Sequence, residues 1–409
     1  MSFEQGISGL NAASKALEVI GNNIANAGTI GAKASRAEFS ELYANAISGS
    51  GGKSAGTGVE IGAVAQQFTQ GNLTTTGNEL DLAINGNGFF QITRPDGTTA
   101  YTRAGQFKLN SDGYVVDNSN NILCGYPTDT SGLRLSSMAT GMQMPTNKPI
   151  APKPTGSVRA EFNLDASTPT ALATTPITSI GSSLNVYDAQ GMQVPLSLYF
   201  VKTPTANTWD VYTAVNSGTP SKVGGLSFNP DGTLKETLDA AGAPTASMNL
   251  PVSITTTSGA PSPFSATVDF TNATQLGASF TVSTLTQDGY APGQLSSIKV
   301  SASGVVQASY SNGQSQALGQ VALANFRNPQ GLSQLGGGAW AETATSGTPM
   351  TGAPGEGNLG AIQSGSLEES NVDLTEQLVE MMTSQRSYQA NAQTIKTMDQ
   401  VVQTLINMH

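Results

Sequence analysis

Both ends of this chain carry apolar residues spaced alternately four and three positions apart, the period of a helix that packs along one seam. The N-terminal seam comprises Phe3, Ile7, Leu10, Leu17 and Ile24, and Ile20 widens it. The C-terminal seam comprises Leu374, Leu378, Met381, Tyr388, Ile395, Val402 and Ile406. The spacing predicts one helix that ends near Asn26-Ala27-Gly28 and a second helix about 50 Å long.

Polar or small residues interrupt both seams, at Ser14, Gly21, Gln385 and Asp399, so an isolated helix pair would be weakly held. Apolar side chains also leave the seam, as at Met382, which is typical of helices buried among several neighbours. The pair could close a domain as a simple hairpin, or the helices could be buried between copies of the chain. The interruptions favour burial between copies.

The middle of the chain has the alternation and turn sequences of β-strands. Turns are predicted at Arg94–Gly97 and Ser111–Gly113, and a proline-rich stretch at Met144–Thr155 predicts a linker into a second β region. We expect a mainly β fold with α-helical termini, in which an outer β domain is inserted into an inner one. The expected parts are a coiled-coil-like two-helix layer with its connecting segment (1–70 with 358–409), a first β domain (71–145 with 285–357) and an inserted β domain (146–284).

Composition restricts the chemistry available to the chain. Its single histidine is His409 and its single cysteine is Cys124, so histidine-based catalysis, metal clusters and an intrachain disulfide are not expected. We expect no cofactor and a buried, inert Cys124. The net charge of −10 and the absence of a basic stripe disfavour nucleic acid. The 28 acidic residues leave open a glycosidase, which needs only two carboxylates.

The sequence also lacks the marks of membrane insertion or of cleaved secretion. No apolar run approaches the length of a membrane span, and no basic-then-apolar leader opens the chain. The stretch Asp117–Asn121 faintly resembles a calcium loop, but it has neither the glycine nor the glutamate that such a loop requires, so a polar turn is expected.

Short motifs form ordered blocks at both ends of the chain and in the first β region. Near the N-terminus the motif residues are Asn22, Asn23 and Asn26, followed by Gly31-Ala32-Lys33. The next blocks are Thr76–Ile84, Gly88–Phe90 and Tyr101–Gly105. The C-terminal blocks are Gly365–Glu368, then Ser370, Asn371, Val372, Asp373 and Leu374, then Gln385, Arg386 and Tyr388. These blocks resemble those of bacterial flagellar rod and hook proteins. Ala32 and Gly338 depart from that family's pattern, which blurs only the local loop geometry.

The length of the chain and its insert, with Val186-Tyr187-Asp188, resemble hook proteins more than the shorter distal rod proteins. The resemblance implies a structural subunit, not an enzyme, that polymerises into a curved tube and acts as a universal joint between motor and filament. It implies terminal helices inside the tube and the insert outside. Besides copies of itself, the implied partners are the rod, the hook cap, the hook–filament junction protein and the flagellar type III export apparatus. The implied location is extracellular, reached without a cleaved signal peptide. A distal rod protein, or a secreted adhesin or glycosidase, remains the alternative.

Overall fold

The computed structural model describes residues 3–42, 58–145, 148–171, 177–256 and 258–407. The chain divides into two compact units. Unit 1 comprises Met1–Thr146, Ser297–Ser309 and Ser315–His409, and unit 2 comprises Asn147–Ser296 with Tyr310–Gln314. Unit 2 is therefore an insertion in the sequence of unit 1, and each unit is described separately below.

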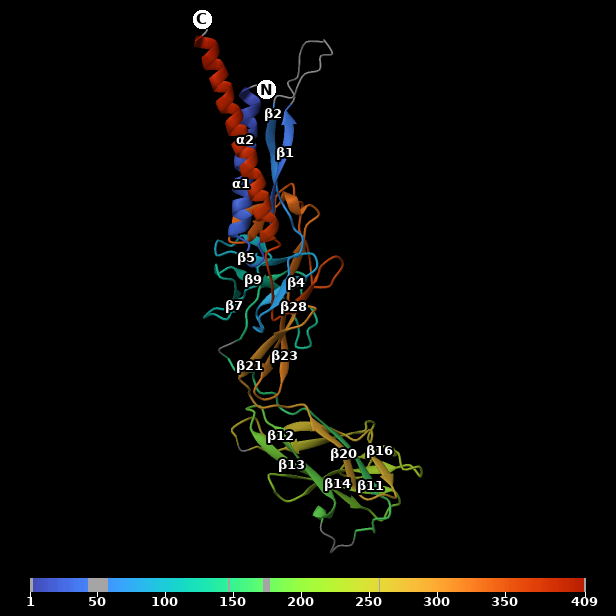
Figure 1. Cartoon of the computed structure of the whole chain (residues 1–409). Helices are drawn as coiled ribbons and strands as arrows, with labels where there is room; N and C mark the ends of the chain where they lie inside the picture. Colours follow the sequence, from blue (N-terminus) through green and yellow to red (C-terminus); the bar gives the residue numbers. More distant parts are fainter. Residues whose placement is uncertain (1–2, 43–57, 146–147, 172–176, 257, 408–409) are drawn as a thin grey trace. The chain divides into compact units, whose positions relative to one another are not determined.

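Two long helices form one part of unit 1. Helix α1 (Phe3–Ala25) and helix α2 (Leu374–Asn407) lie side by side (Figure 1). They run antiparallel, because Gly6 of α1 faces Ile395 of α2, whereas Asn23 bonds to Gln377. A two-stranded ribbon of β1 (Ser35–Leu42) and β2 (Gly58–Gln66) contacts α1. After α1, the chain runs out along β1 and back along β2. It then enters the larger sheet.

The remainder of unit 1 is built on a mostly antiparallel 13-stranded sheet, counted over the described residues, with the path β21-β22-β23-β9-β5-β6-β26-β25. Two short pairs, β28–β4 and β29–β3, lie outside this sheet. The strands are β3 (Leu73–Thr75), β4 (Leu82–Asn85), β5 (Phe89–Thr93), β6 (Thr99–Thr102), β7 (Lys108–Leu109), β8 (Val115–Val116), β9 (Ile122–Tyr126), β10 (Thr140–Gly141), β21 (Leu295–Val300), β22 (Val305–Tyr310), β23 (Ser315–Val321), β24 (Leu323–Asn325), β25 (Ser333–Gly336), β26 (Ala339–Ala341), β27 (Met350–Gly352), β28 (Ala361–Ser364) and β29 (Ser366–Glu368).

Aromatic side chains pack one side of this sheet. The rings of Phe68, Phe89 and Trp340 meet edge to face at centroid distances of 5.5 to 5.6 Å. Tyr101 and Phe326 extend the cluster at 4.8 Å. Such edge-to-face pairs add to the stabilisation that burial of apolar area provides. Phe68 follows the ribbon directly, so this cluster fixes the place where the ribbon joins the sheet.

Unit 2 consists of two five-stranded sheets that share one apolar core. One sheet is a meander in the order β12-β13-β14-β15-β16, and the other has the path β17-β18-β11-β19 with β20 beside β11. Trp209, Phe162 and Leu250 lie in the shared core, which defines a two-layer sandwich. The strands are β11 (Ser157–Asp165), β12 (Gly181–Tyr187), β13 (Gln193–Lys202), β14 (Thr208–Val215), β15 (Ser221–Phe228), β16 (Leu234–Leu238), β17 (Asn249–Ile254), β18 (Phe264–Asp269), β19 (Thr274–Leu276) and β20 (Thr281–Gln287).

The mainly β fold with helical termini, expected from the sequence, is confirmed. The expected polar turn at Asp117 is also present, because its carboxylate accepts the backbone N–H groups of Ser119 and Asn121 at 2.8 and 2.9 Å. Cys124 is a buried free thiol. Asp373 caps α2, because its carboxylate accepts the N–H groups of Thr375 and Glu376 at 2.8 and 3.2 Å.

Candidate self-assembly site

Helices α1 and α2 approach each other closely where α1 carries glycine. A β-carbon added at Gly9 would lie 2.8 Å from the Asn391 amide nitrogen, and one added at Gly6 would lie 3.1 Å from Ile395. Real β-carbons scarcely occupy such distances, so a side chain at Gly9 would force a shift in α2 or in Asn391. The glycine spacing in α1 therefore sets how near the two helices can lie.

The structure places the predicted seam residues in three different environments. Ile20 is buried by its own chain. The half-buried seam residues are Leu10, Leu17, Ile24, Met381 and Ile395. The exposed ones are Ile7, Leu374, Leu378, Tyr388, Val402 and Ile406. The single chain thus covers much of the α1 seam but leaves most of the α2 seam open.

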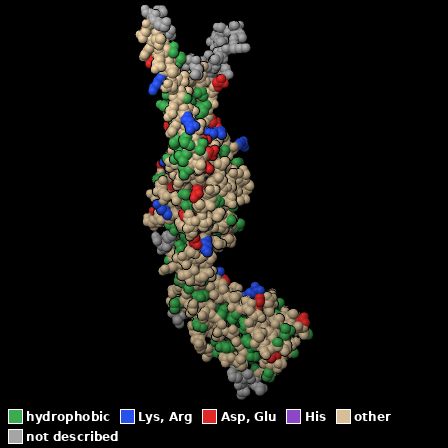
Figure 2. Space-filling view, in the orientation of Figure 1, with side chains coloured by type: hydrophobic (Ala, Val, Ile, Leu, Met, Phe, Trp, Pro, Cys, Tyr) green, Lys and Arg blue, Asp and Glu red, His purple; other side chains and the backbone are tan. Residues whose placement is uncertain are grey.

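Helix α2 exposes further large apolar side chains beyond the predicted seam, namely Val379, Met382 and Val401. Figure 2 shows apolar side chains gathered where the first turns of α2 lie. Leu378, Val379 and Met382 are each exposed to 50% or more. A contiguous apolar surface of this kind on a protein marks an interaction site. The sequence pattern had shown that Met382 leaves the seam, but it did not single out Val379 and Val401.

Asn23 ties the end of α1 to the start of the ribbon. Its side-chain oxygen accepts the Ser35 N–H at 2.8 Å, and its amide nitrogen donates to the Ser35 carbonyl at 2.8 Å and to Gln377 Oε1 at 2.9 Å. Asn26 donates back to the Asn22 carbonyl at 3.0 Å. The asparagine motif therefore ends α1 and joins it to both the ribbon and α2.

Asn371 forms an equivalent set of hydrogen bonds just before α2 begins. Its oxygen accepts the Ala34 N–H at 2.7 Å, and its amide nitrogen donates to the Gln67 carbonyl and the Thr69 hydroxyl at 2.8 and 2.7 Å. Ser370 accepts the N–H of Val372 at 3.3 Å. Of the remaining motif residues, Gln385 and Arg386 are exposed on α2, where the structure gives them no comparable junction contacts.

Beside this junction lies a fully buried charge cluster. Glu368 Oε1 accepts Lys33 Nζ at 2.6 Å and the Gly71 N–H at 3.0 Å, while Oε2 accepts Arg103 Nη1 at 3.1 Å. The Arg103 guanidinium also donates to the Gly86 carbonyl at 2.7 Å. Burial lowers the pKa of both Lys33 and Arg103, and the Glu368 carboxylate opposes that effect by favouring their charged forms. One carboxylate thus joins the segment after α1, the β6 region and the segment before α2.

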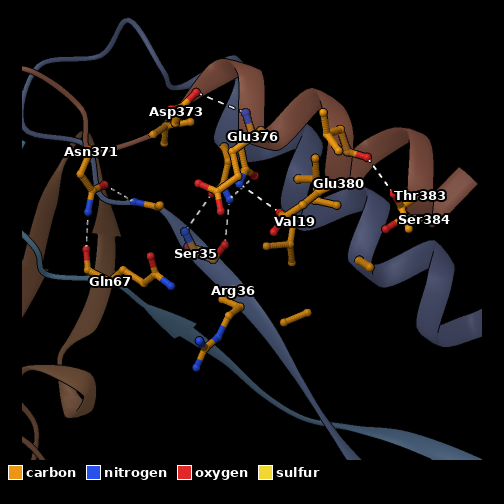
Figure 3. A pocket seen from close by; sticks show the side chains of 18 of the residues that line it. Val19, Ser35, Arg36, Gln67, Asn371, Asp373, Glu376, Glu380, Thr383 and Ser384 are labelled. Atoms are coloured by element: carbon orange, nitrogen blue, oxygen red, sulfur yellow. Dashed lines mark hydrogen bonds between the residues drawn. The ribbon is translucent and has the colours of Figure 1, made fainter.

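A groove of about 390 Å³ opens between α1, α2 and β1. The labelled side chains in Figure 3 come from α1, α2, β1 and the segments next to them. We call this groove the helix groove. Its apolar lining comprises Ala16, Val19, Ile20, Ala34, Ala37, Phe39, Val372 and Val379. Its charged lining comprises Arg36, Asp373, Glu376 and Glu380.

Other kinds of site have little support in the described part of the chain. There, no group of three or more His, Cys, Asp or Glu side chains is placed to hold a metal ion. Neither α1 nor α2 is long and apolar enough to cross a membrane. His409 lies outside the described residues.

Comparison with known proteins finds family models that match four separate stretches of the chain. The family models that match are "Flagella basal body rod protein" at residues 3–33, "Flagellar hook protein FlgE/F/G D1 domain" at 83–160, "Flagellar basal body protein FlaE D2 domain" at 163–290 and "Flagellar basal body rod FlgEFG protein C-terminal" at 363–408. The helices, the sheet of unit 1 and the sandwich of unit 2 thus each match a flagellar model. Together they define the class as a structural protein of the bacterial flagellum.

Individual relatives narrow this class. The chain is 40% identical over 422 residues to "Flagellar hook protein FlgE" of Escherichia coli (strain K12), and the alignment covers all of both chains. It is 39% identical to the protein of that name from Salmonella typhimurium (strain LT2), again over the full length of both. The chain belongs to the flagellar hook protein family. A crystal structure of the Helicobacter pylori flagellar hook protein FlgE2 shares the fold, with a TM-score of 0.54 at 14% identity over 72% of this chain and all of that one.

Proposed function

We propose that this chain is a hook subunit that polymerises through α1 and α2 into a curved tube. The observation that carries the proposal is the open apolar face of α2, because no described residue of the same chain covers it. Burying such a face between copies releases about 25 cal/mol for each Å² of apolar area. The contact residues in the polymer are Ile7, Leu10, Leu17, Ile20, Ile24, Leu374, Leu378, Met381, Tyr388, Ile395, Val402 and Ile406.

The buried cluster around Glu368 suits a subunit that transmits torque. Lys33, Arg103 and Glu368 come from three segments, and their ion pairs join the helical pair to the sheet of unit 1. A force on the helices would therefore reach the sheet through short charge-assisted hydrogen bonds. This supports the role of a universal joint, in which firmly held helices maintain the tube while other contacts exchange during bending.

The proposed function uses the division of the chain that the sequence predicts. The assembly part comprises residues 1–70 with 358–409, the first β domain 71–145 with 285–357, and the insert 146–284. The subunit is extracellular, exported through the flagellar type III apparatus without a cleaved signal peptide. Its further partners are the rod, the hook cap and the hook–filament junction protein. Export as an unfolded chain is compatible with the single cysteine, since a lone cysteine forms no intrachain disulfide.

Electron microscopy of the purified chain at high concentration tests the proposal, with two matched substitutions. Leu378→Asp places a charge on the open face of α2, whereas Leu276→Asp changes a leucine of similar exposure in unit 2, 49% against 50%. A charge buried without a partner costs several kcal/mol per subunit, so Leu378→Asp should abolish tubes. The parent and Leu276→Asp should form them. Tubes from Leu378→Asp as abundant as those of the parent would remove α2 from the assembly core.

A further inference from the structure

We infer that the helix groove binds the last turns of α2 from a second copy of this chain, in a head-to-tail contact. The inference rests on the proposed polymerisation and specifies which two surfaces meet. Both surfaces belong to unit 1, one near each end of the helical pair. The segment that enters the groove, Lys396–Ile406, is called the helix tip below.

The helix tip extends beyond the described part of α1. Ile395 lies opposite Gly6, and α2 continues to Asn407, which adds about 18 Å at 1.5 Å per residue. From Gly6, α1 continues only to Phe3, about 5 Å in the same direction. Figure 1 shows the end of α2 beyond that of α1. Val402 and Ile406 of the tip are accordingly exposed to 49% and 67%.

The helix groove offers an apolar lining of the kind that the tip requires. Val19 and Ile20 of α1 face it from one side, and Ala37 and Phe39 of β1 from another. Phe39 is 44% exposed and Val379 is 53% exposed, so these linings are not already covered by the chain itself. An amphipathic helix that binds in an apolar groove is a recurrent mode of recognition. Its side chains three and four positions apart anchor it in the groove.

Charges on the two surfaces are complementary. Glu376 and Glu380 line the groove on α2, and neither forms an ion pair with a described residue. Lys396 of the tip is exposed and likewise has no ion pair within the described chain. Lys396 therefore supplies the cation that the two glutamates lack.

The positions of the two surfaces determine the kind of assembly. The tip and the groove are different patches of one molecule, so each copy can offer its tip to one neighbour and its groove to another. Such a heterologous contact does not close on itself as a dimer does, and it propagates as a ring or an open helical polymer. A helical tube is the second of these outcomes. A small molecule or an unrelated protein would occupy the groove without producing this propagation.

Disulfide trapping in assembled material tests the contact directly. In Val379→Cys with Val402→Cys, one new thiol lies in the groove and the other on the tip, and both parent side chains are about half exposed. Oxidation of the tubes should give a ladder of covalent oligomers on a denaturing gel. The parent chain, whose Cys124 is buried, is the first control. The pair Val379→Cys with Leu276→Cys, of matched exposure, is the second, and both should remain monomeric on the gel.

The outcomes separate this inference from the proposed function. Tubes that form normally but yield no more cross-linking than the Leu276→Cys control would overturn the groove contact and leave polymerisation intact. A single dimer band without higher oligomers would also overturn it, because the contact would then be two-fold. Failure of the parent chain itself to form tubes would overturn the proposed function, and the groove contact with it.

A charge reversal provides an independent measurement if the cysteine pair does not assemble. Lys396→Glu should reduce the sedimentable tube mass at least about tenfold, since a third carboxylate would then face Glu376 and Glu380. Adding Glu380→Lys to that variant restores an opposite-charge pair and should restore most of the tube mass. Glu380→Lys alone should assemble poorly. If the double variant were no better than Lys396→Glu, the two residues would not be partners.

Discussion

Lys33 Nζ lies 2.6 Å from Glu368 Oε1, although 335 positions of the sequence separate the two residues, and both side chains are fully buried. A buried ion pair stabilises a fold little more than two apolar residues in its place would. Removing only one partner, however, leaves the other charge buried without compensation. Unit 1 is therefore stable only when the late segment that carries Glu368 packs against Lys33.

Replacing Glu368 by glutamine should destabilise unit 1 by about 3–5 kcal/mol, because Lys33 and Arg103 would share a neutral amide. Each unit holds one of the two tryptophans, Trp340 in unit 1 and Trp209 in unit 2. Urea unfolding followed by fluorescence in a Trp209→Phe background therefore reports unit 1 alone. Lys15→Met, which removes an exposed ion pair to Glu18, should have no measurable effect. Equal effects of the two changes would contradict the role of the cluster.

A leucine at Gly9 should separate the helices, since even a β-carbon there would lie 2.8 Å from Asn391. Overpacking of this kind costs about 1–3 kcal/mol. Gly21→Leu is the matched control, because nothing in the described chain lies within 4 Å of a β-carbon at Gly21. Sedimentation should show far fewer tubes for Gly9→Leu than for Gly21→Leu. Comparable yields would mean that close approach of α1 and α2 is not needed for assembly.

Unit 2 should lose stability in acid through Asp188. Burial raises the pKa of this carboxyl, but hydrogen bonds from Ser258, Thr256 and the N–H groups of Gln190 and Met192 outweigh burial and hold it below its usual value. A carboxyl with a depressed pKa in the folded state stabilises the fold above its unfolded pKa, near 3.9, and loses that contribution as the pH falls through the lower folded value.

The check on Asp188 is a pH series of Trp209 fluorescence melts, with Trp340→Phe as background. The parent should become less stable as the pH falls below about 4. Asp188→Asn should be less stable by about 1–3 kcal/mol at pH 7, because its amide presents donors to groups that are themselves donors. It should also lose part of the acid dependence. An unchanged acid profile in Asp188→Asn would show that another group titrates.

Brief trypsin treatment of the free chain should cut after Lys15, Arg386 and Lys396, in helices whose apolar faces lack partners before assembly. Cleavage after Lys33 and Arg103 should be slow, because both side chains are buried against Glu368. Intact mass spectrometry identifies the cuts, and the same digest of assembled tubes is the control, in which the helix sites become protected. If trypsin cut after Lys33 as fast as after Lys15, the prediction that the junction is protected while the helices are open to cleavage would be wrong.

The sequence alone was sufficient for elements whose pattern is local. Heptad spacing predicted α1 and α2, and alternation with turn residues predicted the β regions, because each signal spans only a few residues. The same patterns could not show that Ile20 is covered by its own chain while Leu378 remains open, since that depends on the ribbon beside α1. The seam residues remain a prediction as assembly contacts.

The junction illustrates what local patterns omit. Lys33, Arg103 and Glu368 all lie within the motif blocks that resemble flagellar proteins, yet nothing in their spacing indicates that they meet. Their contact is created by pairing of β29 with β3 and of β28 with β4, which joins distant segments. The burial of these charges follows only from the fold, so no local signal in the sequence marks them.

The pairing of β29 with β3 also has a consequence for the order in which the chain can fold. Leu73 finds its partner only at Glu368, so closing unit 1 requires a very long loop that contains all of unit 2. Contacts so remote in sequence slow folding, because the entropy of loop closure is lost before the contacts compensate for it. During synthesis, the first part of unit 1 cannot complete its fold until nearly the whole chain has been made. A polypeptide with this topology has a built-in kinetic delay before its native contacts form.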